Sequence, residues 1–226
     1  MSIEKLCKRD VALIGIMSDE NSSFLRGAAA APGFIREALH CGSANLCSEL
    51  GVDLAGNPRF VDVGDREIAH GSDNFLSIES EISTVLAKGA LPLVLGGDHS
   101  ISYPVLRAVH RFHGPVKILH FDAHPDLYDD YEGNPHSHAS PFARIMEIGL
   151  ARRLVQIGIR TLNAELREQV KRFGVETHEM RSTDCHAINV EFDGPVYISC
   201  DIDVLDPAFA PGVSHHEPGG LSVRDI

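Results

Sequence analysis

The chain has 226 residues, of which 43% are hydrophobic, and its formal net charge at pH 7 is −12. This length suits one large domain with a sizeable core, so we expect residues 1–226 to form a single domain. The acidic balance argues against nucleic acid or an anionic membrane surface as the main partner. It would suit a small cationic substrate, although an excess of acidic residues also serves solubility alone.

The cysteines and the first residues bear on the compartment of the protein. Five cysteines stand at positions 7, 41, 47, 185 and 200, an odd number without a Cys-x-x-Cys motif. This pattern indicates a reduced protein rather than a disulfide framework. The first ten residues contain no apolar run typical of a secretory signal, and no segment approaches the roughly 20 apolar residues of a membrane helix. We therefore expect a cytoplasmic protein without a membrane span.

Short apolar runs alternate with helix-like segments along the chain, which is typical of an α/β fold with a parallel sheet. The predicted strands cover residues 11–17, 60–63, 91–95, 116–121, 154–159, 175–178 and 196–200. The predicted helices cover residues 72–88, 141–146 and 164–173, and two more begin at Pro32 and Pro104. Residues 129–138 read as a polar loop, and residues 181–193 are ambiguous. Near the end of the sequence, Ser222 is a candidate N-cap of a helix that has barely begun.

Three possible metal ligands alternate directly after the predicted strand 116–121. They are Asp122, His124 and Asp126. In extended backbone, residues i, i+2 and i+4 point to the same side, so two carboxylates and an imidazole would converge there. Alone, such a pattern also occurs in solvated turns, so its meaning depends on the rest of the chain.

Two other predicted strands are followed by ligands of the same kind. Asp201 and Asp203 alternate after residues 196–200, and His99 follows residues 91–95. Ligands of open parallel sheets bind beyond the carboxyl ends of the strands, so six such side chains favour a site for two divalent ions. Four carboxylates and two imidazoles suit Mn²⁺ better than Zn²⁺. The sequence thus predicts hydrolysis by metal-activated water.

Several further residues receive a provisional role. His136 or His138, in the loop after the first ligand group, could carry a proton, because histidine titrates near neutral pH. We expect Asp98 to cap or support its neighbour His99, and His120 to be buried behind the ligands. We assign Cys200 to the core.

Three motifs resemble the signatures of the ureohydrolases, the family that includes arginase, agmatinase and formiminoglutamase. They are GGDHS at residues 96–100, FDAHPD at residues 121–126 and SCDIDVLDPAFAPG at residues 199–212. In detail, residues 133–140 and 213–220 resemble plant-type arginases and related bacterial agmatinase-like enzymes. The resemblance implies a three-layer α/β fold, a parallel sheet with helices on both faces.

The resemblance also implies a chemistry. Two Mn²⁺ ions would be held by His99 and Asp126 on one side, by His124 and Asp203 on the other, and by Asp122 and Asp201 as bridges. A metal-bridging hydroxide, oriented by Asp126, would attack the guanidino carbon of L-arginine or agmatine and release urea with ornithine or putrescine. His138 matches the family's proton-shuttle histidine and is preferred to His136. A homo-oligomer, trimer or hexamer, and a place in arginine or polyamine metabolism are further implications.

Two departures from the family keep alternatives open. The family places a guanidinium-binding glutamate on a strand later than Ile226, so we expect C-terminal elements to be missing and neighbouring strands to have open edges. Asn163 stands where animal-type arginases hold the substrate with a carboxylate, so arginine and agmatine both remain candidates. One alternative is a truncated, non-catalytic member that binds metal or a full-length partner subunit. Another is a single-zinc amide hydrolase on a related fold.

Overall fold

The structure, a computed structural model, describes residues 2–184 and 187–226. The chain divides into two compact units, which are described one at a time. The first comprises Met1–Ser22 and Arg26–Phe112, and the second comprises Ser23–Leu25 and His113–Ile226.

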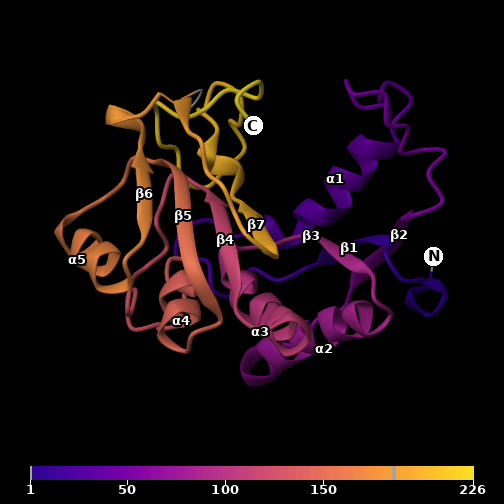
Figure 1. Cartoon of the computed structure of the whole chain (residues 1–226), viewed down its shortest axis with the longest axis horizontal. Coiled ribbons are helices and arrows are strands. Elements are labelled where there is room, and N and C mark those ends of the chain that lie inside the picture. Colours follow the sequence, from indigo (N-terminus) through magenta and orange to yellow (C-terminus); the bar gives the residue numbers. More distant parts are fainter. Residues whose placement is uncertain (1, 185–186) are drawn as a thin grey trace. The chain divides into compact units, whose positions relative to one another are not determined.

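The first unit is built on a three-stranded parallel sheet in the order β2-β1-β3 (Figure 1). Its strands are β1 (Val11–Ile16), β2 (Phe60–Arg66) and β3 (Leu91–Leu95), and its helices are α1 (Ala31–His40), α2 (Asn74–Ala87) and α3 (Ser102–His113). The middle strand β1 is almost entirely apolar and buried, as expected of a parallel strand that is covered on both faces. Ile78, Ile82 and Val85 of α2 are also fully buried in this core.

The second unit contains a four-stranded parallel sheet in the order β6-β5-β4-β7. Its strands are β4 (Val116–Phe121), β5 (Ala151–Ile159), β6 (Glu176–Glu179) and β7 (Val196–Cys200), and its helices are α4 (Pro141–Glu147) and α5 (Ala164–Phe173). Local sequence sets the bounds of α5. The Asn163 side chain accepts a hydrogen bond from Leu166 N at 2.8 Å, and Gly174 ends the helix in left-handed conformation.

The predicted α/β class, with parallel sheets and helices, is confirmed. The bounds of β3, β4, α5 and β7 agree with the sequence prediction, and β5 begins three residues earlier than predicted. The assignment of Cys200 to the core is wrong, because its side chain lies exposed on an outer strand. The ambiguous segment 181–193 includes residues 185 and 186, which lie outside the described residues, and near Ser222 the chain forms a turn.

One outer strand of each sheet has apolar side chains at its surface. Within the described part of the chain, β3 pairs with β1 alone and β7 with β4 alone. Apolar side chains on these strands are exposed, among them Leu91 at 55% and Ile198 at 64%.

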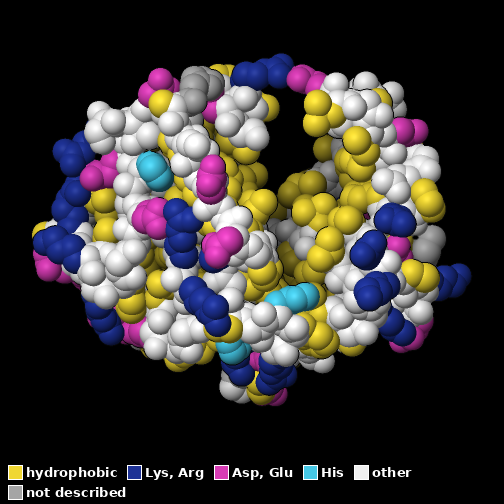
Figure 2. Space-filling model, in the orientation of Figure 1, with side chains coloured by type: hydrophobic (Ala, Val, Ile, Leu, Met, Phe, Trp, Pro, Cys, Tyr) yellow, Lys and Arg dark blue, Asp and Glu magenta, His cyan; other side chains and the backbone are white. Residues whose placement is uncertain are grey.

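The surface of the described residues carries mixed charge. On the face seen in Figure 2, basic and acidic side chains are interspersed rather than gathered in one basic stripe. Such a stripe is typical of a nucleic-acid binding site.

The helices that the structure describes are all too short or too polar to cross a bilayer.

Candidate metal centre and active site

The centre of the candidate site lies beyond the carboxyl ends of β4 and β7. The sheet ladder continues past both strands, because Asp122 N donates to Ile157 O at 3.1 Å and Asp201 N donates to Phe121 O at 2.9 Å. The loops that follow therefore start side by side. They bring one ligand atom each from Asp122, His124 and Asp203 to within 4.8 Å of one another.

The geometry of these three side chains is compact. His124 Nδ1 lies 3.1 Å from Asp203 Oδ2 and 3.4 Å from Asp122 Oδ1. Asp122 and Asp203 are buried, at 1% and 7% exposure, whereas the His124 side chain is partly accessible. The imidazole thus joins two carboxylates that come from different strands, and water can still reach the group.

Two further predicted ligands lie on the same loops. Asp201 caps the turn that carries Asp203, since its Oδ1 accepts a hydrogen bond from Asp203 N at 3.1 Å. Asp126 is buried, and its backbone has a left-handed φ of 50°. His99 belongs to the first unit, where it opens the turn after β3. Within the second unit, three of the six predicted ligands are therefore seen to converge.

A buried chain of polar side chains stands behind Asp122. His120 Nε2 lies 2.8 Å from Asp122 Oδ2, and Gln156 Nε2 lies 3.0 Å from His120 Nδ1 and donates to Pro125 O at 2.7 Å. Thr177 Oγ1 donates to Gln156 Oε1 at 3.3 Å. With Gln156 donating to Nδ1, the proton of a neutral His120 is on Nε2 and faces Asp122. The expected burial of His120 behind Asp122 is confirmed by this arrangement.

The electrostatics of the group favour a cation. Burial, together with the charges of Asp122 and Asp201, raises the pKa of Asp203. Burial alone would lower the pKa of His124, but its hydrogen bonds to Asp122 and Asp203 raise it instead. A divalent ion that prefers oxygen and imidazole ligands fits this donor set.

The two candidate proton carriers occupy different surroundings. His136 is exposed, while His138 is partly buried, with its Nε2 2.8 Å from Ser23 Oγ. The His138 ring lies 5.4 Å from that of His215, which in turn lies 5.7 Å from that of His124. His215 was not predicted from the sequence to belong to this site. The one feature of the sequence that could have pointed to His215 is its position within residues 213–220, which resemble plant-type arginases.

Two further acidic residues, one in each unit, have defined polar contacts. Asp98 accepts hydrogen bonds from Ser100 N at 3.0 Å and Asn21 N at 2.9 Å, which confirms it as a capping group. Glu217, to which the sequence alone assigned no role, has Oε1 3.8 Å from His124 Nε2.

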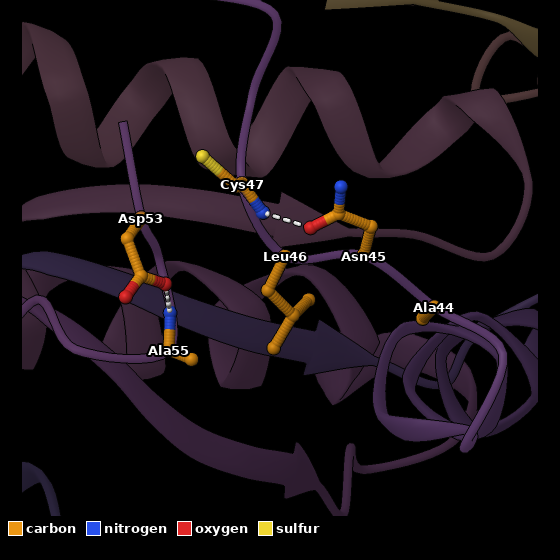
Figure 3. Close-up of a pocket in the computed structure, with 6 residues that line it drawn as sticks. All are labelled: Ala44, Asn45, Leu46, Cys47, Asp53 and Ala55. Carbon is orange, nitrogen blue, oxygen red and sulfur yellow. Dashed lines mark hydrogen bonds between the residues drawn. The ribbon is translucent and has the colours of Figure 1, made fainter. Parts of the chain in front are cut away.

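One hollow of about 410 Å³ lies in the first unit, in the loop between α1 and β2 (Figure 3). Its polar side chains are used within the loop: Asn45 Oδ1 accepts from Cys47 N at 3.0 Å, and Asp53 Oδ1 accepts from Ala55 N at 2.9 Å. This hollow thus has no converging reactive groups among the six residues that line it.

Comparison with known proteins agrees with the site. A family model of the arginase family matches residues 9–226. The chain is 54% identical over 234 residues to "Arginase 1, mitochondrial" of Oryza sativa subsp. indica, covering 97% of this chain and 69% of the rice protein. It is 34% identical to the agmatinase of Bacillus subtilis (strain 168), covering 96% and 76% of the two chains.

A solved structure gives the same result for the fold. The arginase from Medicago truncatula superposes with a TM-score of 0.91 at 50% identity, covering 96% of this chain and 73% of that one. The parallel sheets and helices of this chain are thus arginase-like, and the chain is shorter than these relatives. From its sequence, its fold and its site, the chain belongs to the arginase family of hydrolases.

Proposed function

We propose that this protein is a manganese-dependent ureohydrolase that cleaves the guanidino group of L-arginine or agmatine, releasing urea with ornithine or putrescine. The observation that carries the proposal is the convergence of Asp122, His124 and Asp203 beyond β4 and β7. The identity to plant arginases favours L-arginine of the two substrates.

The metal centre in this proposal has two Mn²⁺ ions. His99 and Asp126 would hold one ion, His124 and Asp203 the other, and Asp122 and Asp201 would contact both. Bound ions would act as Lewis acids and bring the pKa of water toward neutrality. Burial and the charges of Asp122 and Asp201 raise the pKa of Asp203, and a cation at this place would offset both effects.

The chain's own residues would handle the substrate and its protons. Asp126 would accept a hydrogen bond from the attacking water and orient it. His138 would pass a proton to the leaving amine, and the 2.8 Å contact with Ser23 Oγ would keep its ring in place. Histidine suits this step because its pKa lies close to neutral pH.

Asn163, which stands where animal-type arginases have a carboxylate, has structural partners on both sides of its amide. Its Oδ1 caps α5 and its Nδ2 donates to Tyr128 Oη at 2.7 Å. Both the oxygen and the nitrogen of this amide are therefore engaged within the protein. Asn163 is not a candidate for holding the α-amino group of the substrate.

The test is urea release from L-arginine and from agmatine at equal concentration, with Mn²⁺ present. We expect release from L-arginine, and loss of at least about a hundredfold in Asp122→Asn, whose fold circular dichroism would verify. Undiminished release by Asp122→Asn would contradict the proposal. Metal binding without urea release would favour the non-catalytic alternative. A homo-oligomer and a cytoplasmic location stay predictions, which sedimentation and cell fractionation would test.

A further inference from the structure

The guanidinium of Arg160 is fully engaged by backbone carbonyls. Arg160 follows β5 directly and is partly buried. Its Nη2 donates to Asp203 O at 2.6 Å and Leu205 O at 3.3 Å, and its Nη1 to Gly158 O at 3.0 Å and Val204 O at 3.3 Å. Its Nε donates to Glu217 O at 2.8 Å. Arginine has five N–H donors, and each finds an acceptor here.

Most of these acceptors belong to the segment after β7 that carries Asp203. Three of them, the carbonyls of residues 203–205, form the turn that presents Asp203. The backbone of the same region is tied to the β4 loop, because Arg160 N and Thr161 Oγ1 both donate to Ala123 O at 3.0 Å. Ala123 N in turn donates to Asp203 Oδ1 at 3.2 Å. One side chain thus joins the β5 end to the turn after β7, close to the loop between Asp122 and His124.

The charge of Arg160 is not cancelled by a bonded carboxylate. Its hydrogen-bond acceptors are carbonyl oxygens, so the positive charge is left to act on the acids around it, Asp203, Glu217 and Asp122. A fixed cation of this kind weakens the repulsion between the carboxylates near it. A ligand that is already held in position loses less conformational freedom when a divalent ion binds.

We propose that Arg160 is a positioning residue of the metal centre, which fixes the turn carrying Asp203 and offsets repulsion among the acidic ligands before metal binds. The inference rests on the metal site of the proposed function. Lysine would not replace it, because an ammonium group has three donors and cannot reach five carbonyls in a plane. The role is therefore one for arginine specifically.

The test compares Mn²⁺ affinity, by calorimetric titration of metal-free protein, for the wild type, Arg160→Lys and Arg153→Lys. Arg153, on the strand β5 that Arg160 follows, is the control: it bonds both carboxylate oxygens of Glu176 and donates to Glu191 O, away from the ligands. We expect Arg160→Lys to bind Mn²⁺ about 10- to 100-fold more weakly, as is typical when a partner of a metal ligand is removed. Arg153→Lys should leave the affinity within about twofold of the wild type, because it removes no partner of a ligand.

The melting temperature of each metal-free variant separates this role from a purely structural one. Arg160→Lys that melts lower but binds Mn²⁺ with unchanged affinity when folded would overturn the proposal. If Arg160→Lys does not fold, Arg160→Gln, which keeps two N–H donors, takes its place with the same expectation. If neither Arg160 variant folds while Arg153→Lys does, Arg160 is needed for folding itself, and this outcome would also overturn the proposal. A wild type that binds no Mn²⁺ would refute the proposed function itself.

Discussion

The two histidines that could carry a proton, His136 and His138, have different surroundings in the folded protein. His136 is exposed, whereas His138, two positions later, contacts the hydroxyl of Ser23 and lies beside the ring of His215. The sequence alone left both open as proton carriers. The contacts of the folded loop favour His138.

His138→Asn tests that preference. If His138 transfers the proton, the variant should lose about 10²- to 10⁴-fold in kcat, the usual contribution of a general acid or base. Metal content should stay unchanged, because the ring contacts His215 and Ser23 rather than a carboxylate ligand. The exposed His136→Asn is the matched control and should keep nearly full kcat. A larger loss in His136→Asn than in His138→Asn would reverse the assignment.

Gly158, near the end of β5, lies too close to the backbone of Asp122 to carry a side chain. Its φ is 101°, and a Cβ there would lie 2.5 Å from Val204 Cγ2 and 2.8 Å from Asp122 O. We expect Gly158→Ala to lower the free energy of unfolding by about 1–3 kcal/mol or more, measured by chemical denaturation. Gly149→Ala controls for the backbone strain, since Gly149 has a φ of 70° with open space around it. Equal losses in the two variants would show that the close approach does not matter.

Among the elements, α5 and β6 are joined by an ion pair with a definite pH dependence. Hydrogen bonds from Arg167 and Arg181 lower the pKa of Glu179 from its ordinary 4.5 to about 2. A lowered pKa in the folded state stabilises the protein above about pH 4.5, and this contribution disappears as pH falls to about 2. The arginines are solvent-exposed, so screening keeps the effect modest.

Glu179→Gln therefore should melt at a lower temperature than the wild type at pH 7. The difference should shrink as the pH is lowered from about 4.5 toward 2, where the wild-type carboxyl is also protonated. Calorimetric melting of both proteins across this range is the measurement. A difference that stays constant with pH would mean that the carboxylate's charge contributes nothing.

The elements were largely predictable because their signals are local. Strand β4 is an apolar run that ends in polar residues, and α5 has its cap, its period and its terminal glycine within twelve residues. What the sequence missed depends on tertiary contacts. The exposure of Cys200 follows from β7 lying at a sheet edge, and the contacts of His215, Glu217 and Arg160 come from loops that meet only after folding. The convergence of Asp122, His124 and Asp203 agrees with the alternation after the strands, whereas Asp126 departs from extended backbone with its φ of 50°.

At the scale of the whole molecule, the two sheets end in strands with unpaired edges. Strand β7 pairs with β4 alone among described strands, and Ile198 on it is 64% exposed. Such an edge can pair with another chain. We expect the wild type to associate increasingly with concentration in sedimentation velocity, and Ile198→Lys to reduce that association. Identical profiles for both proteins would mean that this edge takes no part.

The central claim is that the chain holds two manganese ions beyond the carboxyl ends of its strands. Elemental analysis of the purified protein, dialysed after loading with Mn²⁺, tests it most directly. The account predicts two manganese ions per chain in the wild type and fewer in Asp203→Asn, with circular dichroism to show that the variant is folded. A single zinc ion per chain, no bound metal, or the same manganese content in Asp203→Asn would contradict it.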